Sequence, residues 1–382
     1  MTAEQWQFKR GPFGSEVAFT SSVMSFSGFQ GRRNFYDNYA GGNFQFTIKN
    51  QANEVANFPR GTFIQILFAN GYTLLSGEVV GITYDDYPGN TGQSTATISC
   101  QDSVVQAGKY LLQNYAGYTE SLTNVQAVAT NSLSDAPDVV TTGTYKSTAA
   151  GTASYNGTML NRLNLLNNTE RGQIIAYGYN MFFISRTNCQ IVANSLSFDP
   201  LVSSATSIAF TDIRRINAYD SFMNAVALTS TTTAGAAIQQ FGNNYDSQTA
   251  YGQSGYSITT VDYSSGQAAE LASWLGYVQS DPNVISFEVD FSDVASNKTA
   301  INSFIYLSVA AFTFPTRGFR LKYRVPGAGS DTSTVVVLEG FSVSGTPAET
   351  QFTAYFSPHV FYEMFILDDQ YNGVLDQSRL GF

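Results

Sequence analysis

The chain has 382 residues, a formal net charge of −10, and only 13% charged residues against 43% hydrophobic ones. Such a low charge content with 29 Phe and 23 Tyr excludes an intrinsically disordered chain. The acidic balance argues against a dedicated nucleic-acid binder, whose phosphate contacts need clustered Lys and Arg. The length is sufficient for about two to four domains with a sizeable core.

No segment indicates a membrane anchor or a secretion signal. The longest apolar run, residues 304–314, is interrupted by Ser308 and Thr313 and is too short to cross a bilayer. The first residues lack a basic region followed by an apolar one. We therefore expect a protein that is made in the cytoplasm, and we expect Cys100 and Cys189 to be buried, reduced thiols.

Residues 17–102 show the clearest pattern of the chain, a series of strands with alternating apolar and polar residues, cut by Gly, Pro and Asn. This is typical of a half-buried antiparallel sheet. The arm before them, residues 1–16, could pair as an edge strand or reach onto a neighbouring molecule. The predicted strands of this series are 23–27, 43–50, 63–68, 74–84 and 94–100.

Helices and a loop-like segment follow the opening strands. Residues 104–113 have an apolar stripe at helical spacing, and residues 114–155, which are rich in Ser, Thr, Ala, Gly and Asn, indicate a linker. Thr158 is a predicted N-cap for a helix over 159–171, and a hairpin over 173–186 completes a small α+β unit.

The second half of the chain again favours strands. A helix is predicted at 267–279 and a polar loop at 231–253, and residues 335–357 repeat the strand, turn and strand order of 74–100. The predicted strands of this half are 219–229, 284–291, 304–312, 318–325, 333–344 and 351–356.

The sequence offers little for catalysis, so we expect no enzyme and no cofactor or metal. His359 is the single histidine and has no recognisable triad partners. The chain lacks the several Cys and His ligands of a zinc site and has no P-loop. Paired carboxylates such as Asp85 and Asp86 leave a glycosidase as the remaining enzyme hypothesis, although adjacent residues of a strand point to opposite faces and both fit turn positions.

A row of basic residues in the predicted strand 318–325 is the strongest candidate for an interaction surface. Arg320, Lys322 and Arg324 share one face of this strand, while Phe319, Leu321, Tyr323 and Val325 line the other. The row either binds an acidic partner subunit or forms a solvated outer face. Its mate could be an acidic patch made of Asp281, Glu288, Asp290 and Asp293.

Several segments, in this order, carry a family resemblance. They are Gly31-Arg32-Arg33, Phe44 to Asn50, Phe58-Pro-Arg-Gly61, Leu74 to Val79, and Ser94 to Asp102. Together they resemble the N-terminal domain of minor tail proteins of long-tailed bacteriophages, the tail-hub or baseplate-hub family. The helix and hairpin ending at Arg186 are similar to the second domain of that family, and residues 366–381 resemble its C-terminal end.

The resemblance implies a mainly β, multi-domain fold with minor α content, in which two tail-tube-like β-barrels accompany a small α+β domain. The expected domains are an N-terminal barrel with its arm (1–113), a linker with the small α+β domain (114–207), a second barrel region with a helix (208–330), and C-terminal strands and tail that complete or flank it (331–382). Arg32, Arg33 and the basic row are then candidate subunit-interface residues.

The function that the resemblance implies is structural. Such a hub forms a ring, here expected as a homotrimer, at the tail tip or baseplate of the virion, and DNA passes through its lumen at ejection. Expected neighbours are a distal tail protein, the tape-measure protein, and a tail fibre or spike. The alternative is a receptor- or carbohydrate-binding tail component, for which Tyr245, Tyr251 and Tyr256 are the candidate contacts.

Overall fold

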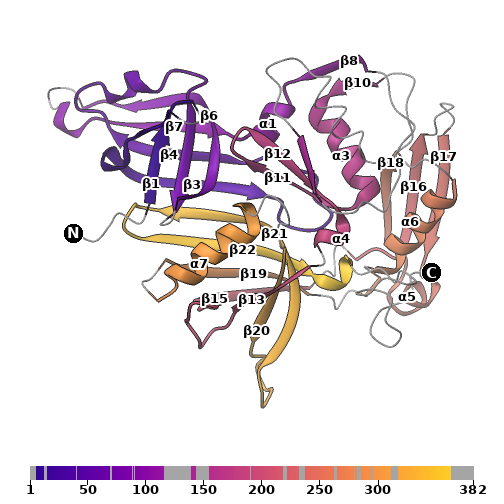
Figure 1. The fold of residues 1–382 in the computed structure, drawn as a ribbon. Coiled ribbons are helices and arrows are strands. Elements are labelled where there is room, and N and C mark those ends of the chain that lie inside the picture. Colours follow the sequence, from indigo (N-terminus) through magenta and orange to yellow (C-terminus); the bar gives the residue numbers. More distant parts are fainter. Residues whose placement is uncertain are drawn as a thin grey trace.

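The structure, a computed structural model, describes residues 6–12, 15–39, 41–68, 71–87, 89, 91–115, 139–142, 155–189, 191–217, 222–231, 237–261, 265–278, 280–281, 285–293, 296–310 and 317–362. Most of the predicted linker and the C-terminal segment 363–382 lie outside the described residues. Strands dominate the remainder, as predicted, with a few helices between them (Figure 1).

The first half of the main sheet is antiparallel and contains every strand predicted for residues 17–102. The arm pairs as an edge strand, because Trp6 to Arg10 run antiparallel to Phe68 to Ile64. The strands, in spatial order, are β3 (Val23–Gly31), β4 (Asn43–Lys49), β7 (Thr95–Gln101), β6 (Tyr72–Asp85), β5 (Phe63–Phe68), β1 (Trp6–Arg10) and the short β2 (Val17–Ala18).

The second half joins the first through one long strand, β21 (Thr332–Gly345). Along one edge, β21 pairs first with β20 through residues 332–337 and then with β3 through residues 340–345. Along its other edge it pairs with β22. The remaining strands are β13 (Val192–Phe198), β14 (Ser207–Ile208), β15 (Asp212–Asn217), β19 (Ile285–Ser292), β20 (Gly318–Tyr323) and β22 (Thr350–Pro358).

Two separate barrels were expected, and this part of the prediction is not confirmed. The two halves form one continuous 14-stranded sheet, and no pairing among the described residues closes either half into a barrel. Instead of closing a barrel, β21 changes partner along one edge, from β20 at residues 332–337 to β3 at residues 340–345, and its pairing with β22 on the other edge shifts register between Leu338 and Gly340.

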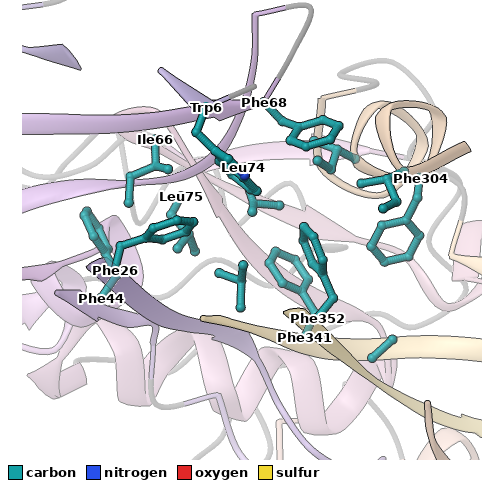
Figure 2. Packing of buried hydrophobic residues seen from close by; sticks show 14 of the residues in the cluster. Trp6, Phe26, Phe44, Ile66, Phe68, Leu74, Leu75, Phe304, Phe341 and Phe352 are labelled. Atoms are coloured by element: carbon teal, nitrogen blue, oxygen red, sulfur yellow. The ribbon is translucent and has the colours of Figure 1, made fainter. Parts of the chain in front are cut away.

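One hydrophobic core serves both halves (Figure 2). The Trp6 ring lies 4.9 Å from the Phe26 and Phe68 rings of the first half and 6.0 Å from Phe352 of the second. Phe304 enters this core from a helix, α7 (Lys298–Ile305), where a strand was predicted over 304–312. The prediction was wrong for residues 304–310, which are helical, because the buried residues of α7, Ala300, Ile301, Phe304 and Ile305, follow helical spacing; residues 311–312 lie outside the described residues.

A small α+β unit packs beside the first half. Its helix α3 (Met159–Glu170) begins, as predicted, at Thr158, whose hydroxyl accepts a hydrogen bond from the Asn161 amide. The predicted hairpin is confirmed as β11 (Gln173–Tyr177) and β12 (Asn180–Ile184). The other elements are α1 (Ser103–Ala107), β8 (Leu111–Tyr115), β9 (Val139–Thr142), β10 (Tyr155–Thr158) and α4 (Arg186–Cys189). The helix predicted at 104–113 therefore ends early.

A second small sheet is inserted between β15 and β19, which pair with each other in the main sheet. It contains β16 (Ala225–Thr231), β17 (Ala237–Asn243) and β18 (Gly255–Thr260), with α5 (Tyr245–Tyr251) and α6 (Ser265–Val278). Of the loop predicted at 231–253, residues 237–243 are a strand and residues 245–251 a helix, while residues 232–236 lie outside the described residues. Gly242 lets α6 approach, since a Cβ there would lie 1.9 Å from the Ala272 carbonyl oxygen.

Candidate functional site

A buried ion pair lies where the two halves of the main sheet meet. Arg32 directly follows β3, and Glu339 occupies the point at which β21 changes partner from β20 to β3. The Arg32 Nε donates to Glu339 Oε2 at 2.7 Å, and the Arg32 amide donates to the Glu339 carbonyl at 3.2 Å. Both side chains are almost fully buried, at 1% and 0% exposure.

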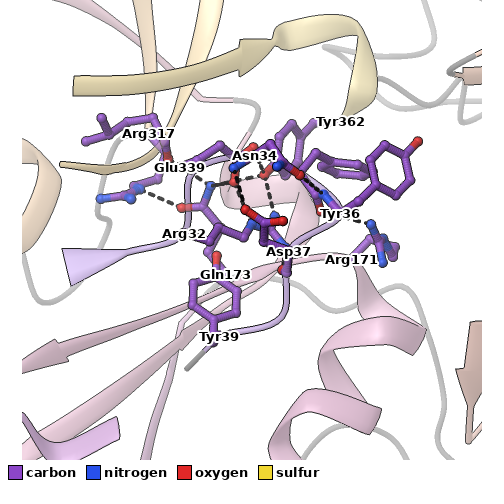
Figure 3. Close-up of polar contacts among 12 residues, drawn as sticks. Arg32, Asn34, Tyr36, Asp37, Tyr39, Arg171, Gln173, Arg317, Glu339 and Tyr362 are labelled. Carbon is purple, nitrogen blue, oxygen red and sulfur yellow. Dashed lines mark hydrogen bonds and ion pairs between the residues drawn. The ribbon is translucent and has the colours of Figure 1, made fainter. Parts of the chain in front are cut away.

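Three further side chains extend this pair into a network, the junction network, drawn in Figure 3. Tyr362 donates from its hydroxyl to Glu339 Oε1 at 2.7 Å and accepts from Arg32 Nη2 at 2.9 Å. Gln173, on β11, donates to the Tyr362 hydroxyl and accepts from Arg317 Nε at 2.6 Å. The network therefore connects both halves of the sheet, the small α+β unit and the end of the described chain.

Electrostatics favour the charged form of Arg32. Burial disfavours the charged guanidinium, but the Glu339 charge, the nearby Tyr39 and Tyr362, and the hydrogen bond to Glu339 together outweigh this, and the pKa of Arg32 lies well above its ordinary value. Burial, and next the Glu339 charge, raise the pKa of Tyr362 well above its usual range, so this hydroxyl stays protonated and donates. Removing one partner of such a pair leaves an uncompensated buried charge. The network thus fixes the relative positions of the units that it joins.

Sequence reasoning missed most of this network, because its directly hydrogen-bonded pairs are separated by 23 to 330 residues along the chain. Arg32 was expected at a subunit interface, but its guanidinium lies inside the chain, where Glu339 and Tyr362 hold it. Its neighbour Arg33 is exposed and lies over the rings of Phe29 and Tyr355. The one available signal was a lone Glu within the apolar run 335–341.

The basic row predicted over 318–325 is present, with Arg320 and Lys322 on β20 and Arg324 just after it, but its three members differ in their contacts. Lys322 Nζ pairs with Asp199 at 3.0 Å and with Asp331 at 3.4 Å, and Arg324 Nε pairs with Asp331 at 2.9 Å. The hydrogen bond and charge of Asp199 raise the pKa of Lys322. Arg320 is exposed and forms no ion pair with any residue that the structure describes.

The acidic patch that was expected to bind the basic row makes most of its contacts with other residues of the same chain. Asp293 is buried and accepts hydrogen bonds from Trp6 Nε1 at 3.2 Å and from the Thr350 amide at 2.9 Å. Glu288 pairs with Arg214 at 2.6 Å, and Asp290 accepts from the Thr353 hydroxyl. A basic strand of a partner would therefore have to compete with these contacts.

The outer face of the main sheet carries a row of uncharged polar residues that crosses the seam between the halves. An open depression of about 520 Å³ lies along it, lined partly by Gln45, Ser27 and Ser344. In register across six neighbouring strands, the members of this neutral row are Ser99 (β7), Gln45 (β4), Ser27 (β3), Ser344 (β21), Gln351 (β22) and Ser292 (β19).

The described residues contain few groups suited to catalysis. They include no cluster of three or more His, Cys, Asp or Glu that could hold a metal ion. Cys100 and Cys189 are free and buried, as predicted, and burial raises the pKa of both thiols. His359 begins a short 3-10 turn, η5 (His359–Phe361), at the end of β22. No helix among the described residues has the length and apolar character to cross a membrane.

The tyrosines predicted as a glycan-binding platform belong to the inserted unit. Tyr245 and Tyr251 lie at the two ends of α5, with 71% and 50% of their surface exposed, and Tyr256 on β18 is half-buried. Buried Asn224 holds this region in place, because its side-chain amide donates to Ser247 Oγ and to the Gly252 carbonyl.

Comparison with known proteins gives matches in structure alone. No family model and no curated protein matches the sequence. The chain is similar to a tail protein from Neisseria meningitidis MC58, with a TM-score of 0.61 and 10% identity over 94% of this chain and 98% of that one. It is also similar to the 43 kDa tail protein of prophage MuSo2 from Shewanella oneidensis, with a TM-score of 0.55 and 10% identity over 94% of this chain and 98% of that one. Prophage tail protein gp18 from Listeria monocytogenes EGD-e matches with a TM-score of 0.54 and 8% identity over 91% of this chain and 94% of that one.

These likenesses cover nearly the whole length of each protein, so the chain has the fold of phage tail proteins. At 8 to 11% identity they establish the fold and do not transfer the role of any residue. The resemblance noted from the sequence is therefore confirmed at the level of the fold that these phage tail proteins share. A component of a type VI secretion system from E. coli shares the fold as well, with a TM-score of 0.50.

Proposed function

We propose that this chain is a structural tail-hub protein of a phage virion, which forms a homotrimeric ring at the tail tip and joins the tail tube to the distal tip. The observation that carries the proposal is the joining of two sheet halves by β21 and β3 into one sheet with a common core. Two sheet halves in each chain would let three chains present six units around the tail axis, which would match a hexameric tube.

The neutral row supports a role in the passage of DNA. Its six positions, contributed by both halves, are Ser or Gln, and none is Lys or Arg. DNA binds tightly where Lys and Arg neutralise its phosphates, so a surface without them lets it slide. On this proposal the neutral row faces the lumen, and the distal tail protein, the tape-measure protein and a fibre or spike are the neighbours along the tail axis.

The oligomeric state of the purified chain tests the proposal. Native mass spectrometry at micromolar concentration is expected to give a trimer, and negative-stain images to give a ring with a central opening. A chain that remains monomeric and binds neither the tail tube nor the distal tail protein would contradict the hub function.

A receptor- or carbohydrate-binding tail component is the second candidate. The exposure of Tyr245 and Tyr251 on a short helix held by Asn224 favours it, because sugar rings stack on exposed aromatic side chains. Binding of host-surface glycans by a monomeric chain, lost on replacing Tyr245 and Tyr251 by Ala, would support this function in place of the hub.

A further inference from the structure

The hairpin between β6 and β7 ends in an exposed acidic and aromatic tip. Asp85 is the last residue of β6 and Asp86 follows it, and they are the one pair of adjacent, exposed carboxylates among the described residues. The structure gives neither side chain a hydrogen bond or an ion pair with another described residue. Tyr84 and Tyr87 flank them and are 54% and 51% exposed.

This tip has the composition of a surface that binds arginine. A single carboxylate can accept two forked N–H groups of a guanidinium, so either Asp can bind it alone, and a tyrosine ring can stack on its flat face. Tyr and Arg are also the residue types that contribute most to protein interfaces. Left in water, two tyrosines at half exposure and two unpaired carboxylates contribute little to the fold of the chain itself.

Arg320 is the matching group on the other half of the sheet. Its neighbours in register are Ser197 on β13 and Val335 on β21, neither of which is charged. Lys322 and Arg324, further along the same face, already have Asp199 and Asp331 as partners. Arg320 is therefore the member of the basic row that is available to form an ion pair with a carboxylate from outside the chain. Half-buried Val335 offers apolar surface beside it.

The two surfaces belong to different parts of the sheet. β20 and β3 pair with successive stretches of the same edge of β21, at residues 332–337 and 340–345, and β4 and β7 lie between β3 and β6. Arg320 pairs with Val335, whereas Asp85 lies beyond the level of Gly345, so about ten residues of strand, or about 33 Å, separate them along β21. A contact between them therefore joins two copies, and because the two surfaces are unlike, it is head-to-tail, the kind of contact that closes into a ring.

We propose that the tip formed by Tyr84, Asp85, Asp86 and Tyr87 binds Arg320 of a second copy of this chain. This inference rests on the proposed ring and names one of its subunit contacts. Reversing the charge on either side replaces attraction by repulsion and should weaken association at least about tenfold.

The test is a charge-swap series on the full chain, with association measured by native mass spectrometry and sedimentation velocity. Asp85→Lys combined with Asp86→Lys, and separately Arg320→Glu, should shift the wild-type ring towards monomer, and the three substitutions together should restore it. Matched controls are Glu270→Lys with Glu349→Lys, and Arg60→Glu, which change exposed charges elsewhere and should leave the ring intact. Circular dichroism verifies that each variant is folded.

Two results would overturn the inference, and they are distinguishable. If the wild type forms a ring that both reversals leave intact, or if the combined variant fails to recover it, this contact is refuted while the hub function stands. If the wild type itself stays monomeric with and without the substitutions, the proposed ring fails and the contact fails with it.

Discussion

Replacing Glu339 by Gln keeps the shape of the side chain but removes the charge that balances Arg32. Both partners are 1% exposed or less and 2.7 Å apart, so the Arg32 guanidinium is left buried without a counter-charge. Breaking such a pair from one side costs about 3 to 5 kcal/mol. For a chain of 382 residues, an unfolding entropy of about 2.1 cal/mol/K per residue converts this into a fall in Tm of about 4 to 6 °C.

Differential scanning calorimetry of E339Q against wild type measures this effect. The matched control is Arg214→Met, which removes an exposed ion pair with Glu288, where Arg214 is 73% exposed; its cost is below about 1 kcal/mol. Replacing both partners of the buried pair, Arg32→Met with Glu339→Leu, should recover much of the loss, because no buried charge remains unpaired. If the Tm of E339Q equals that of the Arg214→Met control, the junction network does not hold the two halves together.

Four further predictions test other parts of the structure. Trp6→Ala should destabilise the chain by about 3 to 5 kcal/mol in urea unfolding, since its ring packs against both halves, while Gln7→Ala should cost far less. Gly340→Ala should cost about 1 to 3 kcal/mol, because its Cβ would lie 2.5 Å from the Gln30 carbonyl oxygen, whereas Gly81→Ala has open space. Burial raises the pKa of Asp102 from 3.8 to about 7, so its contribution to stability is lost as pH rises from about 4 to 7, and Asp102→Asn should flatten the unfolding free energy over that window. Cys100 and Cys189 should both resist a thiol reagent until the chain unfolds, and rapid labelling of either in the native state would contradict their burial.

Local pattern was enough to predict the first half of the sheet. Alternation is strict in β4, where Phe44, Phe46 and Ile48 point inwards, and β5 has the predicted bounds. The cap at Thr158 and the hairpin of β11 and β12 followed from short-range chemistry in the same way. These elements are specified by neighbours within about ten residues, which is the range over which a sequence pattern is informative.

Long-range pairing could not be predicted in the same way. The junction of β21 with β3 joins residues more than 300 positions apart, and nothing near Glu339 indicates Arg32 as its partner. The helix α7 was mistaken for a strand because an apolar run fits either structure, and packing of Phe304 in the shared core decides between them. The basic row was located correctly, but the sequence could not reveal that two of its members form ion pairs with Asp199 and Asp331.

A reconstruction of the phage tail tip with this chain placed in it tests the hub function most directly. We predict three copies around the tail axis, with the neutral row, including Gln45, Ser27 and Ser344, facing the lumen, and with the Asp85 tip of each copy against Arg320 of the next. A chain found singly at the periphery, or a ring in which the neutral row faces away from the lumen, would contradict this account.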